Sequence, residues 1–215
     1  MRPRVKICCI KSSEEANMAI AAGASALGLV GPMPSGPGMI SNELIYEIAR
    51  EVPPPISTFL LTSEVTVDGI LSHYELTKTH TVQIVDKLEN GSHLELREKL
   101  PAVKLVQVLH VIDESVIDEA LELDGSVDAF LLDSGNPNLE TKVLGGTGNV
   151  HNWDISRNLV ESVSVPVFLA GGLNPDNVKK AVEHVNPYGL DLCTGVRTEG
   201  RLDPHKLDQF FKAID

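Results

Sequence analysis

The sequence predicts a (β/α)8 barrel built as a single domain over residues 1–215. Short apolar runs recur eight times, segments of helical periodicity alternate with them, and the length suits one domain with a sizeable core. An open, doubly wound sheet can also hold eight strands, so the count by itself leaves that second architecture open. A barrel of this length requires short loops.

The candidate strands are the apolar, β-branched runs. In chain order they read RVKICCI, ALGLVG, ISTFLLT, TVQIV, KLVQVLHV, AFLLDS, PVFLAGG and GLDLCTG. Side chains along a barrel strand alternate between the interior and the surrounding helices. If Val5 and Ile7 pack outward, Lys6 and Cys8 therefore point into the barrel.

The first helical segment has a clear start signal. Ser12, followed three residues later by Glu15, is a capping box, and Ala16, Ala19 and Ile20 form the apolar face of the helix that it opens. Helical periodicity continues in SNELIYEIAREV, DGILSHYELTK, HLELREK, DESVIDEALEL, NPDNVKKAVEHV and DPHKLDQFFKAI.

Two late helices are expected to begin with proline. Pro175 follows Asn174 and Pro204 follows Asp203, the arrangement of a capping residue before a proline at the first helical position. Two connections are longer than the rest, residues 31–41 and 134–154. Both follow the C-terminal ends of strands, the face on which barrel enzymes carry their chemistry.

Composition limits the compartments and the classes of partner that we expect for this protein. The formal net charge of −12 argues against binding to nucleic acid or to an acidic membrane surface. No apolar run reaches the roughly 18 residues of a membrane span and no signal-peptide core is present, so we expect a cytoplasmic protein. Three cysteines form no disulfide framework, and the seven histidines show no metal-ligand spacing, so we expect no metal site.

Two glycine-containing turns late in the chain are candidates for a phosphate site. Gly171 and Gly172 follow one strand, and Thr194 and Gly195 follow the next. Glycine lets a ligand approach the backbone closely, a following helix offers free N–H groups, and barrels commonly bind phosphate at the loops after strands 7 and 8. The alternative is that both are simply tight turns between strand and helix.

A thiol and a carboxyl are expected to converge at the same face. Cys8 ends the first strand and Asp133 ends the sixth, where outward-facing Phe130 and Leu132 leave Asp133 directed at the barrel mouth. Such a pair can act as base and acid. The alternatives are a small buried hydrophobe for Cys8 and a loop cap for Asp133.

Several motifs resemble phosphoribosylanthranilate isomerase of tryptophan biosynthesis. They are KICCIKSSEEANMAIAAGASALGLV, FLLDS followed by GGTG, FLAGGLNPDNV and PYGLDLCTGV, and the resemblance runs nearly end to end. It implies a (β/α)8 barrel without cofactor or metal, with Cys8 as general base, Asp133 as general acid and Gly171, Gly172 and Gly195 in phosphate-binding loops. The implied reaction is an Amadori rearrangement, an aldose–ketose isomerisation of an aminated ribose 5-phosphate.

The sequence departs from this family at the end of the site that would hold anthranilate. Gly38 stands where the family has an arginine, and Val85 where it has a histidine. Arg197 stands in place of a glutamate and is a candidate substrate-binding residue; the alternative is a solvated loop arginine. Cys9 replaces a glycine, and we expect its side chain to face away from the pocket.

Three functions stay open at this point. The chain is an isomerase of phosphoribosylanthranilate, an isomerase of the same chemistry acting on another phosphorylated amino sugar, or a phosphosugar-binding barrel without catalysis. We expect a monomer or a homodimer.

We also expect Lys6 and Asp191 to form an ion pair inside the barrel. Each lies two residues before an inward position on neighbouring strands, and a buried lysine without a partner is costly.

Overall fold

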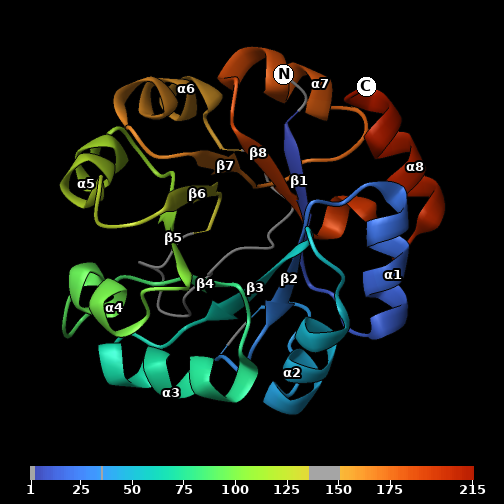
Figure 1. The fold of residues 1–215 in the computed structure, drawn as a ribbon. Coiled ribbons are helices and arrows are strands. Elements are labelled where there is room, and N and C mark those ends of the chain that lie inside the picture. The colour runs from blue at the N-terminus through green and yellow to red at the C-terminus, as the bar shows by residue number, and fades with distance from the viewer. Residues whose placement is uncertain (1–2, 35, 136–150) are drawn as a thin grey trace.

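The computed structural model describes residues 3–34, 36–135 and 151–215, and over these ranges the chain forms a closed parallel barrel (Figure 1). The strands are β1 (Arg4–Ile7), β2 (Ala26–Val30), β3 (Ser57–Thr62), β4 (Thr81–Ile84), β5 (Lys104–His110), β6 (Ala129–Asp133), β7 (Val167–Leu169) and β8 (Gly189–Leu192). The predicted (β/α)8 fold class is confirmed. Pairing of β1 with β8 closes the sheet and excludes the open architecture.

Helices follow the strands and surround them (Figure 1). They are α1 (Ser13–Ala22), α2 (Asn42–Glu51), α3 (Val67–Thr77), α4 (His93–Lys99), α5 (Ser115–Leu123), α6 (Trp153–Ser162), α7 (Val178–Val185) and α8 (Pro204–Ala213). Between β8 and α8 lie a 3-10 turn, η1 (Thr194–Val196), and a small hairpin of β9 (Arg197–Thr198) and β10 (Arg201–Leu202). None of the described helices has the length and apolar character needed to cross a bilayer.

Two of the predicted helix starts are confirmed and one is wrong. The Ser12 side chain accepts a hydrogen bond from the Glu15 N–H, and Asp203 caps α8 with Pro204 in its first turn. Helix α7, in contrast, begins only at Val178, so Pro175 lies in the preceding turn. The reason is that the Asn174 carboxamide oxygen accepts from the N–H groups of Asp176 and Asn177 and thereby closes a separate turn.

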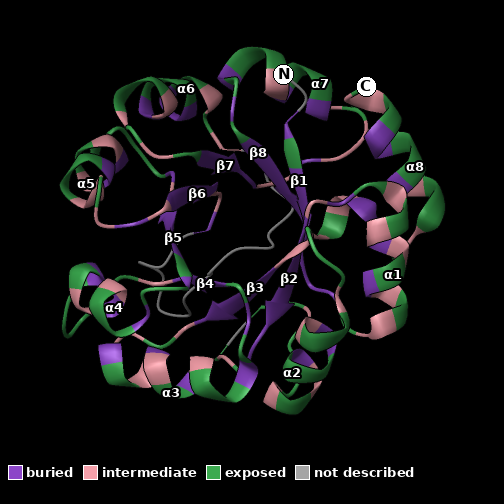
Figure 2. Cartoon of the chain, viewed as in Figure 1, coloured by how far each residue is buried: buried purple, intermediate pink, exposed green. Residues whose placement is uncertain are grey.

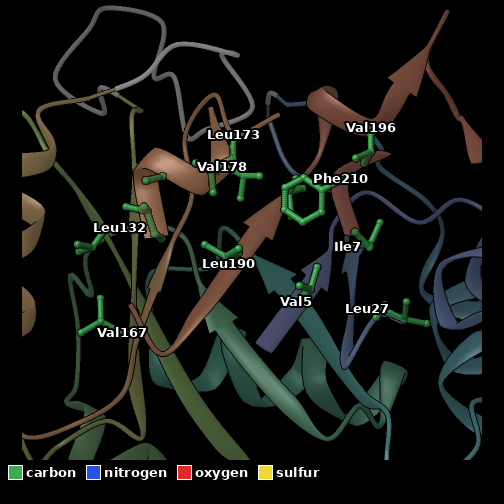
Figure 3. Packing of buried hydrophobic residues seen from close by; sticks show 14 of the residues in the cluster. Val5, Ile7, Leu27, Leu132, Val167, Leu173, Val178, Leu190, Val196 and Phe210 are labelled. Atoms are coloured by element: carbon green, nitrogen blue, oxygen red, sulfur yellow. The ribbon is translucent and has the colours of Figure 1, made fainter. Parts of the chain in front are cut away.

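The strands separate two apolar layers. Val5 and Ile7 pack outward with residues of the helices, such as Phe210 of α8, in the large cluster of which Figure 3 shows part. The barrel interior holds a second cluster that includes Cys8, Phe59 and Phe168. The barrel strands are mostly buried, although β1 and β5 each begin with an exposed residue, and the other exposed residues lie on the helices, in the loops and in the β9–β10 hairpin (Figure 2). The predicted alternation on β1 is therefore correct.

Candidate active site

A cavity opens at the C-terminal ends of the strands, the face on which barrel enzymes carry their chemistry. Each strand, or the turn directly after it, contributes to its wall. Most lining side chains are apolar. Those with polar atoms or thiols are Cys8, Cys9, Gln83, Asp133, Asp191, Cys193 and Thr194. The predicted catalytic pair thus lines one cavity.

Cys8 lies directly after β1 and points inward. Its N–H donates to the Leu192 carbonyl at 2.7 Å, which extends the contact between β1 and β8 by one residue. A Cβ atom built on Gly28 of β2 would lie 2.7 Å from the Cys8 Sγ. The glycine in the neighbouring strand therefore makes room for the thiol.

Asp133 is the last residue of β6, and its side chain lines the cavity. Burial raises the pKa of this carboxyl above its ordinary value. The Ser134 N–H, which donates to Oδ1 at 2.7 Å, opposes that rise, and the negative charge of Asp191 adds to it. The net direction favours the protonated carboxylic acid, the form that can donate a proton.

The predicted ion pair beneath the site is confirmed. The Lys6 Nζ lies 2.9 Å from the Asp191 Oδ2, the lysine side chain is fully buried, and its Nζ also lies 5.3 Å from the centre of the Phe59 ring. Burial has the largest single effect on the pKa of Lys6 and lowers it. The charge of Asp191, its hydrogen bond and the nearby Cys8 and Cys9 together more than offset burial, so the pKa is raised. This pair joins β1 to β8 below the cavity.

Two residues that line the cavity each have a buried side-chain oxygen without a hydrogen-bond partner among the described residues. The oxygens are Asp191 Oδ1 and Gln83 Oε1. Buried acceptors of this kind require donors, and the hydroxyl groups of a sugar can supply them. The sequence analysis did not single out Gln83 as a site residue. Its signal was the strand alternation, because Gln83 lies two residues before the inward-facing Val85.

The two glycine turns lie against each other at one edge of the cavity. Gly171 and Gly172 have left-handed backbones, with φ of 79° and 64°. A Cβ atom on Gly195 would lie only 2.0 Å from the Leu173 carbonyl oxygen, so only glycine fits between the turns. No described carbonyl accepts from the N–H groups of Gly171, Gly172, Thr194 or Gly195. Gly171, Gly172 and Thr194 line the cavity directly.

The prediction for Cys9 is wrong, because its side chain lines the cavity. Its backbone is left-handed, with φ of 62°, which turns the residue away from the strand alternation. The Cys9 thiol hydrogen-bonds to Cys193 and Cys8, and these bonds, with burial, raise its pKa. The same bond from Cys9 lowers the pKa of Cys193.

Among the described residues, no group of three or more His, Cys, Asp and Glu is arranged to hold a metal ion.

Arg197 is neither a solvated loop residue nor one of the described residues that line the cavity. Its side chain is buried and its guanidinium lies 2.8 Å from Glu15.

The other positions singled out in the sequence lie near the cavity or outside the described residues. Val85, which stands where the family has a histidine, is buried and apolar and lines the cavity. Gly38 has φ of 80° and lies against Cys9. The GGTG run, residues 145–148, lies outside the described residues.

Comparison with known proteins gives one consistent result. The family model described as N-(5'phosphoribosyl)anthranilate (PRA) isomerase matches residues 5–213. A relative named N-(5'-phosphoribosyl)anthranilate isomerase 2, from Methanosarcina mazei, is 39% identical over 209 residues, which cover 96% of this chain and 92% of the relative. A relative named N-(5'-phosphoribosyl)anthranilate isomerase from Haloferax volcanii is 35% identical over 211 residues, with 98% and 91% covered.

Solved structures agree with the relatives. The phosphoribosyl anthranilate isomerase of Thermotoga maritima superposes with a TM-score of 0.81 at 27% identity, covering 99% of this chain and 98% of that one. A second structure of such an isomerase, in complex with reduced 1-(o-carboxyphenylamino)-1-deoxyribulose 5-phosphate, gives a TM-score of 0.77 at 26% identity with the same coverage.

Proposed function

The chain belongs to the N-(5'-phosphoribosyl)anthranilate isomerase family, and on this basis we propose that it isomerises N-(5'-phosphoribosyl)anthranilate in tryptophan biosynthesis, with Cys8 as general base and Asp133 as general acid. The observation that carries the assignment of roles is the convergence of this thiol and this carboxyl on one cavity. The reaction is an Amadori rearrangement, in which an aminated aldose becomes a ketose.

Asp133 acts first in this proposal. Burial raises the pKa of its carboxyl, the direction that favours the acid form, and in the proposed step the carboxyl passes its proton to the ring oxygen of the ribose. The C1–O bond of the ring then breaks, and the amine nitrogen supplies the electron pair that forms a Schiff base. The Asp133 carboxylate left behind is stabilised by the Ser134 N–H.

Cys8 acts second. Its thiolate removes the proton from C2 of the opened sugar, and the electron pair of that C–H bond moves toward the Schiff base to give an enolamine. The enolamine then rearranges to the ketose. Lys6 precedes Cys8 by two residues and therefore occupies the next inward-facing position, deeper in the barrel. Its positive charge, although paired with Asp191, favours negative charge in the cavity.

The substrate phosphate is expected at the two glycine turns. The N–H groups of Gly171, Gly172, Thr194 and Gly195 are free of described acceptors, and together they offer the donors that an anion requires. Backbone donors suit an acidic chain, which carries a formal charge of −12 and has no lysine in either turn. Gln83 and Asp191 then face the sugar hydroxyls.

The decisive experiment follows the fluorescence of phosphoribosylanthranilate as purified protein consumes it. Cys8→Ala and Asp133→Asn should each lower the rate by about 10²–10⁴-fold, the usual loss on removal of a positioned acid or base, with an unchanged circular dichroism spectrum. Cys8→Ala with near-parental activity would contradict the assignment of the base. A parent that binds the sugar phosphate without turning it over would favour the non-catalytic alternative.

One observation favours a second substrate class. No lysine, arginine or histidine is among the described residues that line the cavity, so no described cation faces an anthranilate carboxylate. A phosphorylated amino sugar with an uncharged substituent on nitrogen would not need one. A comparison of kcat/KM for the two substrates decides between them, and a higher value for phosphoribosylanthranilate supports the first proposal.

A monomer or a homodimer in the cytoplasm remains our expectation for the assembly and its location. Sedimentation equilibrium of the full chain measures the first, and cell fractionation the second. A larger complex, or recovery with membranes, would contradict the expectation.

A further inference from the structure

Arg197 occupies a buried junction between four segments of chain. It is the first residue of β9, three positions after Thr194 of the predicted phosphate turn. Its Nη1 donates to Glu15 Oε1 at 2.8 Å and to the Gly200 carbonyl at 3.2 Å. Its Nη2 donates to Glu15 Oε2 at 3.0 Å and to the carbonyls of Cys9 at 2.5 Å and Cys8 at 3.3 Å. Both terminal nitrogens of the guanidinium are thus engaged and have little capacity left for a ligand, whereas the buried Nε has no hydrogen-bond partner among the described residues.

Glu15 completes the junction from the opposite side. Beyond Arg197, its carboxylate accepts from the N–H of Lys11 and the N–H of Leu202, both at 3.0 Å. In a simple capping box this carboxylate would bond only to the start of its own helix. Here it also ties the first turn of α1 to the β9–β10 hairpin, and Arg197 lies between the two.

The carbonyls that Arg197 holds are those of Cys8 and of the strained residue after it. Cys9 has φ of 62°, a backbone conformation that costs free energy for a residue with a side chain. Fixing both peptide planes around Cys9 also fixes the direction of the Cα–Cβ bond of Cys8. The planar fork of arginine suits this task, since it can donate to two carbonyls and a carboxylate at once.

We infer that Arg197 and Glu15 are positioning residues, which hold the Cys8 thiol in alignment with the phosphate turn at Thr194 and Gly195. The inference rests on the proposed role of Cys8. It assigns Arg197 a function without substrate contact, in place of the substrate-binding role expected from the sequence. The phosphate and the reacting C2 atom belong to one covalently connected substrate, so the distance between the phosphate turn and the base must match the span between them, and the junction bridges the two.

Three variants test the inference in steady-state kinetics with phosphoribosylanthranilate. Arg197→Met should lower kcat by about 10²-fold, the loss that follows a displacement of roughly 1 Å in a catalytic group, with KM changed less than about threefold. Glu15→Gln should have a smaller effect in the same direction, because Arg197 keeps its bonds to the two carbonyls. Arg197→Lys should lie between the parent and Arg197→Met, because lysine retains the charge but not the fork.

A matched control and a second measurement separate positioning from other roles. Arg201→Met removes the same charge from an exposed position of the same hairpin and should leave kcat unchanged. The N–H groups of Cys8 and Ile10 donate to the carbonyls of Leu192 and Gly28. Their hydrogen exchange should accelerate in Arg197→Met while amides on the far side of the barrel keep their protection. This readout needs no turnover, so it still tests the junction if the proposed reaction is wrong.

Three results would overturn the inference. A KM raised more than tenfold with kcat unchanged would make Arg197 a substrate ligand. A lower melting temperature with kcat intact in the folded variant would leave it a purely structural role. Unchanged exchange at Cys8 and Ile10 would show that the junction does not hold the turn. If Arg197→Met does not fold, Arg197→Lys and Glu15→Gln carry the same comparisons.

Discussion

Cys9 and Gly38 lie against each other at the mouth of the barrel, and each depends on the other. A Cβ atom on Gly38 would lie 2.5 Å from the Cys9 Cβ and 2.9 Å from its Cα, at a backbone φ of 80°. A real Cβ atom essentially never lies this close to an atom of a non-adjacent residue. The cysteine side chain therefore occupies the space that a side chain at position 38 would need.

Gly38→Arg by itself should thus destabilise the protein, by about 1–3 kcal/mol as for other overpacked sites. Adding Cys9→Gly should recover part of the loss, because it removes the Cβ and Sγ atoms and relieves the left-handed backbone, although the main chain at position 9 still lies close to residue 38. Urea unfolding of the parent, the two single variants and the double variant measures the coupling. Strictly additive free energies would show that the two positions do not compete.

Asp133→Asn should raise the free energy of unfolding at neutral pH while it removes activity. Because the pKa of Asp133 is raised in the folded protein, the folded state holds that proton more tightly than the unfolded chain does. The ionised carboxyl therefore costs stability above the folded pKa, and the cost fades as the pH falls below the unfolded value of about 3.9.

Urea unfolding from about pH 3 to pH 7 tests this pH dependence. The free energy of unfolding of Asp133→Asn should exceed that of the parent most near pH 7, and the difference should vanish near pH 3. Asp118→Asn, at an exposed position on α5, is the control and should follow the parent throughout. A variant less stable than the parent at pH 7 would mean that the carboxylate is stabilised in the fold.

At the scale of elements, the turn between β7 and α7 is built around one carbonyl. The carboxamides of Asn174 and Asn177 both donate to the Gly172 oxygen, at 3.2 and 2.9 Å. Asn177 Oδ1 also accepts from the Asn174 N–H. Together with the Asn174 carboxamide oxygen, which accepts from the N–H groups of Asp176 and Asn177, these bonds close the turn before α7 begins. They occupy the Gly172 carbonyl, while the N–H groups of Gly171 and Gly172 donate to no described carbonyl and can serve a ligand.

Asn177→Ala should therefore weaken the proposed phosphate site. The variant loses two hydrogen bonds in the turn, each worth about 1 kcal/mol, so KM should rise by up to about thirtyfold with kcat little changed. Lys179→Ala, at an exposed position in the first turn of the same helix, controls for changes in α7. Inhibition by inorganic phosphate should weaken in parallel, and an unaltered phosphate inhibition constant would place the anion elsewhere.

At the scale of the whole molecule, the Lys6–Asp191 pair joins the first strand to the last. The two residues are paired in register across the β1–β8 contact that closes the barrel. Both charges are withdrawn from water, so neither is tolerated without the other. The pair therefore acts on closure of the barrel as well as on the electrostatics of the site.

Breaking this pair should be more costly than replacing it. Asp191→Asn leaves a buried lysine without a counter-charge and should destabilise by about 3–5 kcal/mol. The double variant Lys6→Met/Asp191→Asn removes both charges and should be clearly more stable than the single one. Denaturant unfolding compares the three proteins at the same pH. A double variant no better than Asp191→Asn would show that the two charges are not coupled.

The barrel and its inward positions could be predicted from the sequence because local rules determine them. Alternation along β1 placed Lys6 and Cys8 inside, and it holds because each side chain of a strand lies opposite to its neighbours. The Asp203–Pro204 start of α8 and the Ser12 cap of α1 depend only on residues within the same turn. Cys8 and Asp133 line one cavity because the C-terminal ends of parallel strands share one face.

Only the tertiary structure decided the parts that depend on distant contacts. Arg197 reaches Glu15, which lies 182 positions earlier in the chain, and the same folding brings the Gly195 turn against Leu173. Cys9 faces the cavity because its backbone is left-handed, and that conformation is held by the guanidinium from the other end of the chain. Periodicity and capping act over a few residues, whereas these contacts exist only after β8 has closed on β1 and brought the two ends of the sequence together.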